Sequence, residues 1–328
     1  MSVIGNAILV GGGGGSDDTF AFISVTYPAG STCTATNGTK TLTAPDTSGI
    51  ALFRIPTPTS LPESWTVSCT DGTQLSNYVV TLTQKGQGEI IELMYLVLES
   101  FSTISDSNFV KLIQAAHSNE VDLQQNAGWR IGDKRTISIS AFTDGGNISH
   151  SAQDIDIVIG SFDDYENCGC VMQFDFADAI ATGSRLGSTT NNGGYAASLM
   201  YRSTLPALTS ALPAYLHDLL IPFSCKTSAG NKSTTIETIN NNKLALRSEF
   251  EIFGAHSNSV SGEGIQIPYY ITSANRIKKR GHSGTADTWW ERSPVASSGT
   301  YFCYVDSSGA MRYGRGDNSY GLAPFGCI

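Results

Sequence analysis

The chain has 328 residues and a net charge of −9, and 40% of its residues are hydrophobic and 15% charged. This length allows two domains with separate cores. The one basic cluster, at residues 278–280, is too small for the cationic footprint that phosphate binding requires. The sequence also lacks an apolar stretch long enough to cross a membrane. We therefore expect neither nucleic-acid binding nor membrane insertion.

The start of the chain and its cysteines indicate where it folds. Residues 1–10 lack a positively charged leader and are too short for a signal peptide, so we expect folding in a cytoplasm. The 7 cysteines are scattered and few for the length, which favours free thiols. Cys33 and Cys69 fall on predicted strands, where two buried free thiols are favoured over the alternative of a disulfide.

The N-terminal part consists of an arm and a series of short strands. Residues 1–18 contain the strand-like segment Ala7–Val10 and then five glycines, which suit either a flexible linker or an attachment arm that orders against a partner. Asn37 and Gly38 predict a hairpin. Strand-like segments rich in β-branched and aromatic residues occupy 20–27, 32–36, 39–43, 50–55, 65–69, 78–83 and 89–95. Their number and regular turns indicate an immunoglobulin-like β-sandwich at residues 19–95.

Three segments of this sandwich carry a resemblance to a known class. YPAG at 27–30, residues 49–55, and WTVSC at 65–69 resemble the small carboxypeptidase-regulatory or PEGA-like sandwiches. Such sandwiches are appended to surface proteins and to phage structural proteins. The resemblance implies an attachment role for the N-terminal part.

Residues 96–127 are expected to form a helical connector. Ser105 suits the N-cap, and apolar residues follow it at helical spacing. From residue 128 onward the pattern is mixed. Strands are predicted at 136–140, 154–159, 170–174, 240–246, 248–253, 301–305, 311–313 and 322–327, and helices at 195–205 and 213–220. The predicted fold class is mainly β with α+β: an N-terminal β-sandwich followed by an α+β domain at 128–328.

The end of the chain carries the most specific pattern. WWERSP at 289–294 is followed by FCYV at 302–305, by Ser308 and Gly309, and by GLAPF at 321–325. This series resembles the W-x-R-S-P … V-x-x-x-G … G-V/L-x-P ending of an uncharacterised domain family of phages and prophages. Segments upstream fit the same family, so the resemblance spans residues 128–328. That family is similar to the C-type-lectin and formylglycine-generating-enzyme fold group, which includes the variable proteins of diversity-generating retroelements.

The resemblance implies a rigid C-type-lectin-like scaffold that presents its last few dozen residues to a ligand. Residues 289–294 and 321–325 would be framework, with Arg292 pairing inward with a carboxylate or with carbonyl groups. Tyrosine gives a large amphipathic contact at low entropic cost, and arginine is enriched among binding hot spots. The candidate ligand-binding residues are Tyr301, Arg312, Tyr313, Arg315, Asp317, Asn318 and Tyr320.

The leading hypothesis is a phage virion protein, in a tail or fibre, that binds a host cell-surface glycan or protein. The arm and sandwich would bind other virion proteins, and a homotrimer would give avidity to weak single sites. The protein would be located in the virion and assembled in the bacterial cytoplasm. One alternative is a head-decoration or fibre protein without a receptor role. A weaker alternative is a hydrolase of surface polysaccharide.

Catalytic patterns are weak in this sequence. The 5 histidines are dispersed, and no Ser-His-Asp order is visible. Glu249 and Glu251 would share one face of a predicted strand, where solvated carboxylates are favoured over a glycosidase pair. Arg315–Asp317 spells the tripeptide RGD, which we interpret as a turn. We therefore expect a protein that is not an enzyme.

Metal-binding patterns are also weak. Cys168 and Cys170 lack a second closely spaced pair for zinc, and the acidic residues at 163–166 lack the spacing of a calcium loop. Cys303 and Cys327 invite comparison with the cysteines of formylglycine-generating enzymes, but without an activating base they are interpreted as buried strand thiols. We expect neither a metal nor another cofactor.

Overall fold

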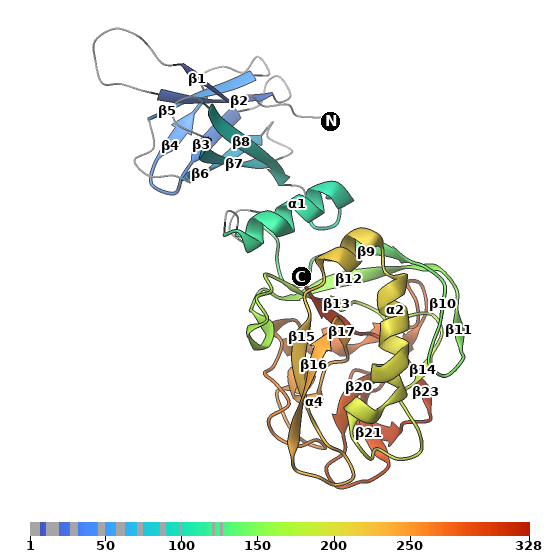
Figure 1. Ribbon diagram of the computed structural model, residues 1–328. Coiled ribbons are helices and arrows are strands. Elements are labelled where there is room, and N and C mark those ends of the chain that lie inside the picture. Colours follow the sequence, from blue (N-terminus) through green and yellow to red (C-terminus); the bar gives the residue numbers. More distant parts are fainter. Residues whose placement is uncertain are drawn as a thin grey trace. The chain divides into compact units, whose positions relative to one another are not determined.

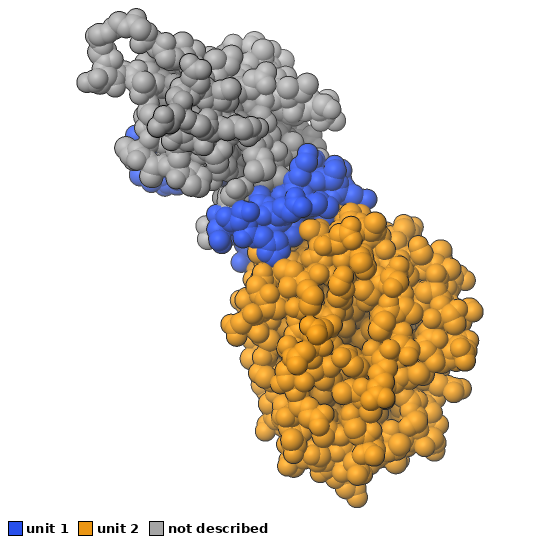
Figure 2. Space-filling view, viewed as in Figure 1, with its two compact units in different colours: residues 1–129 blue, residues 130–328 orange. Residues whose placement is uncertain are grey.

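The computed structural model describes residues 7–10, 20–26, 32–44, 50–56, 63–70, 75–85, 90–98, 100–119, 122–124 and 127–328. The chain divides into two compact units, residues 1–129 (unit 1) and 130–328 (unit 2), which Figure 2 colours separately. It is mainly β, with small sheets and short helices, as predicted. In the described part of the chain, no helix combines the length and the apolar character needed to span a bilayer.

Unit 1 contains two antiparallel sheets and one helix within its described residues (Figure 1). One sheet has the strand order β1-β2-β5, and the other has the order β4-β3-β6-β7-β8. The elements are β1 (Ala7–Val10), β2 (Phe20–Thr26), β3 (Thr32–Thr36), β4 (Thr41–Thr43), β5 (Ile50–Pro56), β6 (Glu63–Thr70), β7 (Leu75–Lys85), β8 (Ile90–Leu98) and α1 (Asp106–His117). Each of the predicted strand segments thus corresponds to one of β2 to β8.

Strand β1 pairs with β2 of the same chain. Ala7 lies opposite Ile23, and Val10 lies opposite Phe20. The glycines at 11–15 lie outside the described residues. The strand-like segment predicted within residues 1–18 is therefore β1, an edge strand of unit 1.

The hairpin predicted at Asn37 and Gly38 is confirmed between β3 and β4. Gly38 has φ +83°, and the Asn37 side chain accepts hydrogen bonds from the backbone N–H groups of Thr39 (3.0 Å) and Lys40 (2.8 Å). Glycine adopts this left-handed conformation without strain, and Asn mimics a backbone acceptor in a turn. These two residues therefore fix the register of β3 and β4.

The expectation of a free thiol at Cys33 is wrong, because Cys33 is disulfide-bonded. Cys33 is buried on β3, and the strand register places Cys69 of β6 directly opposite. Directly opposed residues of antiparallel strands have Cβ atoms about 4.5–5.5 Å apart, which is close to the separation in a disulfide. The sequence pattern alone did not specify that β3 pairs with β6, and for this reason the disulfide was not predicted.

Helix α1 forms as predicted and belongs to unit 1. The Ser105 side chain accepts a hydrogen bond from the backbone N–H of Asn108 (3.3 Å), which caps the helix. The buried Phe109 ring lies 6.0 Å from Phe101 and 5.9 Å from Trp129. The segment expected as a connector at 96–127 thus has its own aromatic core.

Unit 2 is built on an antiparallel sheet with the strand order β17-β24-β13-β12-β9 (Figure 1). Smaller sheets pair β10 with β11, β14 with β23, β15 with β16, β18 with β19, and β20 with β21 and β22. The strands are β9 (Lys134–Ile139), β10 (Phe142–Thr143), β11 (Ser149–His150), β12 (Gln153–Ser161), β13 (Gln173–Phe176), β14 (Ser184–Arg185), β15 (Phe223–Ser228), β16 (Ile236–Asn242), β17 (Leu244–Ala245), β18 (Lys278–Lys279), β19 (Ala286–Asp287), β20 (Trp289–Pro294), β21 (Tyr301–Val305), β22 (Met311–Arg315), β23 (Ser319–Tyr320) and β24 (Phe325–Cys327). The helices are η1 (Tyr165–Asn167), η2 (Tyr195–Ala197), η3 (Met200–Thr204), α2 (Leu205–Ala211), α3 (Ala214–Leu219), α4 (Glu249–Phe253), α5 (Pro268–Ile271) and η4 (Ser273–Arg276).

The large sheet brings the two ends of unit 2 together. Strand β9 alternates between exposed and buried residues, and Ile155, Ile157 and Ile159 of β12 are buried. Strand β24, the last in the chain, lies between β13 and β17. In the sequence, strands β20 to β23 follow β17 and precede β24, and both of these flanking strands belong to the large sheet.

The strand predicted at residues 248–253 is wrong, because this segment forms helix α4. The Ser248 side chain accepts from the N–H of Glu251 (3.2 Å), and the Glu251 carboxylate accepts from the N–H of Ser248 (3.0 Å). Gly254 ends the helix with φ +67°. This S-x-x-E capping box is visible in the sequence and outweighs the alternation of apolar residues.

Candidate functional site

The sheet β20–β21–β22 changes from buried to exposed across its width. All residues of β20 are buried, β21 is partly buried, and β22 is an edge strand with three exposed residues. The predicted framework segments 289–294 and 321–325 are buried throughout, as expected. A buried edge gives the sheet rigidity, while the opposite edge leaves side chains free to contact a ligand.

Two tyrosines form the exposed aromatic part of this sheet. Tyr301 and Tyr313 are 36% and 52% exposed, and their ring centroids lie 5.5 Å apart. The register pairs Tyr301 with Arg315, so the three side chains lie on one face of the strands. We call Tyr301, Tyr313 and Arg315 the tyrosine patch.

The RGD tripeptide is a turn, as predicted, and its two charges pair with each other. Asn318 donates its N–H to the carbonyl of Arg315 (3.0 Å), which closes the turn. Arg315 donates two hydrogen bonds of 3.0 Å to the carboxylate of Asp317. These bonds lower the pKa of the Asp317 carboxyl. The pair holds the guanidinium of Arg315, the residue directly opposite Tyr301, against Asp317.

The other predicted residues lie with the opposite face of β22. Arg312 is paired with Tyr304 across the strands, is 58% exposed, and bridges to Asp306 (3.2 Å). Asn318 donates to the hydroxyl of Tyr320 (2.9 Å). The Tyr320 ring packs 4.5 Å from Trp290 and 4.8 Å from Tyr304, measured between centroids. Tyr320 and Asn318 therefore belong to a packed cluster, and the seven candidates separate into two groups.

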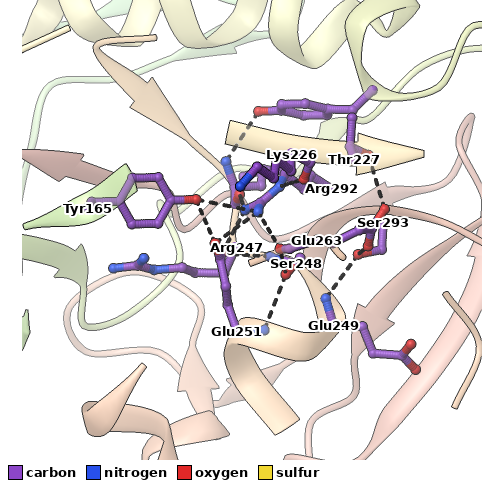
Figure 3. Close-up of polar contacts among 12 residues, drawn as sticks. Tyr165, Lys226, Thr227, Arg247, Ser248, Glu249, Glu251, Glu263, Arg292 and Ser293 are labelled. Carbon is purple, nitrogen blue, oxygen red and sulfur yellow. Dashed lines mark hydrogen bonds and ion pairs between the residues drawn. The ribbon is translucent and has the colours of Figure 1, made fainter. Parts of the chain in front are cut away.

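A buried ion pair anchors the inner edge of the sheet (Figure 3). Arg292 of β20 donates to both carboxylate oxygens of Glu251, at 2.6 and 2.8 Å, and both side chains are fully buried. It also donates to the carbonyls of Lys226 (3.0 Å), Leu246 (2.8 Å) and Glu263 (2.9 Å). The inward pairing predicted for Arg292 is confirmed. Burial lowers the pKa of Arg292, but Glu251, Tyr165 and Cys225 together outweigh this effect and raise the pKa well above its ordinary value.

A second chain of contacts joins Ser293 to two glutamates. The Ser293 hydroxyl donates to the Glu263 carboxylate and accepts from the backbone N–H of Glu249 (2.9 Å). Burial raises the pKa of Glu263 to about 7, although hydrogen bonds from Ser293 and Ser228 oppose that shift. Figure 3 shows the carboxylate of Glu249 pointing away from Arg292.

Glu249 and Glu251 are buried helix residues rather than the solvated strand residues that we expected. The Glu249 carboxylate accepts from the N–H of Asn258 (3.0 Å) and the N–H of Ser259 (2.7 Å). The Glu251 carboxylate is held by Arg292 and by the hydroxyl of Tyr165 (2.6 Å). Each carboxylate thus has its own partners, and they do not form the facing pair that glycoside hydrolysis requires.

Glu291 is a further buried carboxyl, and no sequence pattern singles it out. It is fully buried on β20, and neither of its oxygens has a hydrogen-bond partner in the described part of the protein. Burial raises its pKa well above the ordinary value, and the nearby Glu249 and Glu263 add to that shift. Burial without a hydrogen-bond partner thus favours the neutral form of this carboxyl.

Three cysteine thiols lie together beside the large sheet. The sulfur atoms of Cys168, Cys170 and Cys327 all lie within 4.8 Å of one another, and no other described group of His, Cys, Asp and Glu side chains of this size is as close. Hydrogen bonding from Cys327 lowers the pKa of Cys168 to about 7, while burial raises the pKa of Cys327. The sequence showed the Cys168–Cys170 pair, but the third thiol comes from β24, far along the chain. Cys303 is a buried strand thiol, as predicted.

An open pocket of about 560 Å³ lies elsewhere in unit 2. Its lining includes Tyr201, Arg202, His217 and Lys243. Arg202 is engaged with the carbonyl of Ala196 (2.9 Å), and His217 lies 3.1 Å from the carboxylate of Asp218. None of the predicted ligand-binding residues lines this pocket.

Residues 177–328 are similar to a protein family described as a domain of unknown function, DUF6273. The matched segment includes the tyrosine patch, the Arg292–Glu251 pair and Cys327, but excludes Cys168 and Cys170. No curated protein and no solved structure gave a significant match to the chain.

Proposed function

We propose that unit 2 is the ligand-binding module of a phage virion protein, and that its tyrosine patch contacts a glycan or protein on the host cell surface. One observation carries the proposal. Tyr301 and Tyr313 expose neighbouring aromatic rings, tilted by 31°, on the two strands farthest from the fully buried edge strand β20. Exposed paired aromatic rings on a rigid framework are costly unless they serve recognition.

The chemistry of the patch suits a sugar or a polar peptide. Aromatic faces pack against apolar C–H surfaces, and the phenol groups supply hydrogen bonds at the same place. Arg315 has N–H donors beyond the two that Asp317 accepts, and these can donate to a polar group of the ligand. Arg312 lies on the opposite face of β22 and pairs with Asp306, so it is not part of the tyrosine patch.

The buried network supplies the rigidity that such a surface needs. Arg292 ties β20 to α4 and to three backbone carbonyls, so the buried edge strand of the sheet that carries the patch is held firmly. Binding to a preorganised surface avoids the entropic cost of ordering it. A residue such as Arg292 therefore supports recognition without touching the ligand.

The proposal includes finer assignments of fold. The two sheets of unit 1 form an immunoglobulin-like sandwich, and unit 2 has a C-type-lectin-like fold. The strand orders of unit 1 support the first assignment. The second is supported by the position of β24 in the sheet that contains β9, with the exposed β22 inserted between them in sequence. Unit 1 would attach the protein to other virion proteins, and a homotrimer would multiply weak contacts.

The test is binding of the full chain to arrays of bacterial cell-wall glycans and to whole bacterial cells. Saturable binding that Tyr313→Ala weakens about 30-fold supports the proposal. A structural role in a head or fibre predicts instead that Tyr313→Ala blocks particle assembly and that the chain binds no cell or glycan. Binding that persists in Tyr313→Ala but fails in Tyr201→Ala would move the ligand site to the pocket and contradict the proposal.

A further inference from the structure

The loop at residues 163–170 is shaped around its two cysteines. The Asp164 side chain accepts from the N–H groups of Gly169 (2.8 Å) and Cys170 (3.1 Å), which closes the loop. Gly169 has φ +83°, and Glu166 and Asn167 also have positive φ values. This costs backbone strain at the two residues that are not glycine. In this loop conformation the sulfur atoms of Cys168 and Cys170 lie within 4.8 Å of each other.

The loop also supplies a hydrogen bond to sulfur. The backbone N–H of Tyr165 points at the Sγ atom of Cys170, 3.4 Å away. Amide donors of this kind stabilise negative charge on a sulfur ligand. Cys170 is buried, so a charged sulfur there requires such compensation.

The third thiol arrives on a rigid element. Cys327 is fully buried on β24, opposite Gln173 of β13, and its backbone carbonyl accepts from the N–H of Ile221 (2.9 Å). Its sulfur lies within 4.8 Å of both loop sulfurs. Cys168 is only partly buried, which leaves a route from solvent to the three sulfurs.

We propose that Cys168, Cys170 and Cys327 form a three-thiolate site for a thiophilic metal ion of the Cu⁺ or Zn²⁺ class. Sulfur ligands around a tetrahedral zinc ion, each about 2.3 Å from the metal, lie about 3.8 Å apart, so the thiols need only a small contraction. Thiolate ligands select soft ions of this kind over Mg²⁺ and Ca²⁺. Cu⁺ is satisfied by the three sulfurs, whereas Zn²⁺ takes water as a fourth ligand on the side of Cys168.

Such an ion would clamp the loop at 163–170 to the last strand of the large sheet. Binding releases the thiol protons and links folding to metal occupancy. The site is separate from the tyrosine patch, so the two proposals stand or fall independently.

The test uses the full chain, reduced and stripped of metal with a chelator. Cu⁺ and Zn²⁺ are titrated separately against a chromophoric competitor, and X-ray absorption counts the sulfur ligands. We expect one ion per chain with three sulfurs, bound more than about 100-fold more weakly by Cys168→Ala than by the matched control Cys303→Ala. Cu⁺ with sulfur ligands alone and Zn²⁺ with one additional light ligand both support the site and identify which ion it prefers.

Two results would overturn the inference. One is equal affinity of Cys168→Ala and the wild-type chain for the metal ion. The two proteins share every other thiol, including those of a reduced Cys33 disulfide, so equal affinity would mean that the ion binds without Cys168. The other is a count of two or fewer sulfurs in wild-type protein. Cys168 is partly exposed, so its alanine variant is expected to fold, and a matching melting temperature verifies this.

Discussion

Arg292 and Glu251 form a fully buried bidentate ion pair that joins β20 to the first turn of α4. Glu251 also accepts from the N–H of Ser248 and so completes the capping box of that helix. The Glu251 carboxylate therefore holds both the start of α4 and strand β20, which is the edge strand opposite the exposed β22. Losing either partner leaves an uncompensated charge in the interior.

Arg292→Met is expected to destabilise the chain by about 3–5 kcal/mol, because it leaves Glu251 buried without its cation. The carbonyls of Lys226, Leu246 and Glu263 also lose their donor. Urea unfolding of unit 2, followed by tryptophan fluorescence, measures the change. In a double-mutant cycle, Arg292→Met with Glu251→Gln should cost clearly less than the sum of the single variants. Strict additivity would show that the two side chains do not interact.

Stability should fall as the pH rises from about 4.5 to about 7, because burial raises the pKa of Glu263 to about 7. The folded state then holds a proton that the unfolded state has released, so ionisation favours unfolding. Integrated over this window, Glu263 contributes about 3 kcal/mol of pH dependence. Glu291, whose pKa is also raised, acts in the same direction.

The measurement is the free energy of unfolding at pH 5 and pH 7.5 for wild type and Glu263→Gln. The amide of the variant cannot ionise. The free energy of unfolding of the wild type should therefore fall relative to that of the variant as the pH rises from 5 to 7.5. A constant difference at both pH values would mean that Glu263 is ionised in the folded protein throughout.

Gly230→Ala should destabilise unit 2 strongly. Gly230 has φ +69°, and a Cβ there would lie 1.8 Å from the backbone oxygen of Asn191. Asn191 in turn donates to the carbonyls of Ser298 (2.9 Å) and Tyr301 (2.8 Å), so the shift reaches the start of β21. The matched control is Gly132→Ala, since Gly132 has φ +97° with nothing near its Cβ position. The control should cost only the backbone strain of about 1–2 kcal/mol, and equal thermal shifts in the two variants would contradict this account.

Local signals predicted much of the fold. The Asn37–Gly38 hairpin, the cap at Ser105 and the alternating strand predicted at residues 136–140, which is part of β9, each depend on neighbours in sequence, and each formed as expected. The strand predicted at residues 248–253 was wrong because two local signals competed there. The capping box of Ser248 and Glu251 prevailed over a period-two pattern.

The features that sequence could not supply are long-range. Arg292 was expected to find a carboxylate or carbonyls, but its partner Glu251 was assigned to a solvated strand. Cys327 could not be joined to Cys168 and Cys170 without the pairing of β24 with β13. Likewise, Tyr313 is exposed on β22 whereas Tyr320 lies on β23 and packs against Trp290, although both tyrosines looked alike in sequence.

The central claim is that the tyrosine patch binds a ligand, and the affinity of Tyr313→Ala tests it most directly. The full chain and this variant are titrated against the cell-wall glycan or bacterial cells that the wild type binds, with Tyr201→Ala as control. Tyr313 is half exposed, so its loss should change stability by less than about 0.5 kcal/mol and weaken binding about 30-fold. Wild-type affinity in Tyr313→Ala, with a fold shown intact by its melting temperature, would contradict the account.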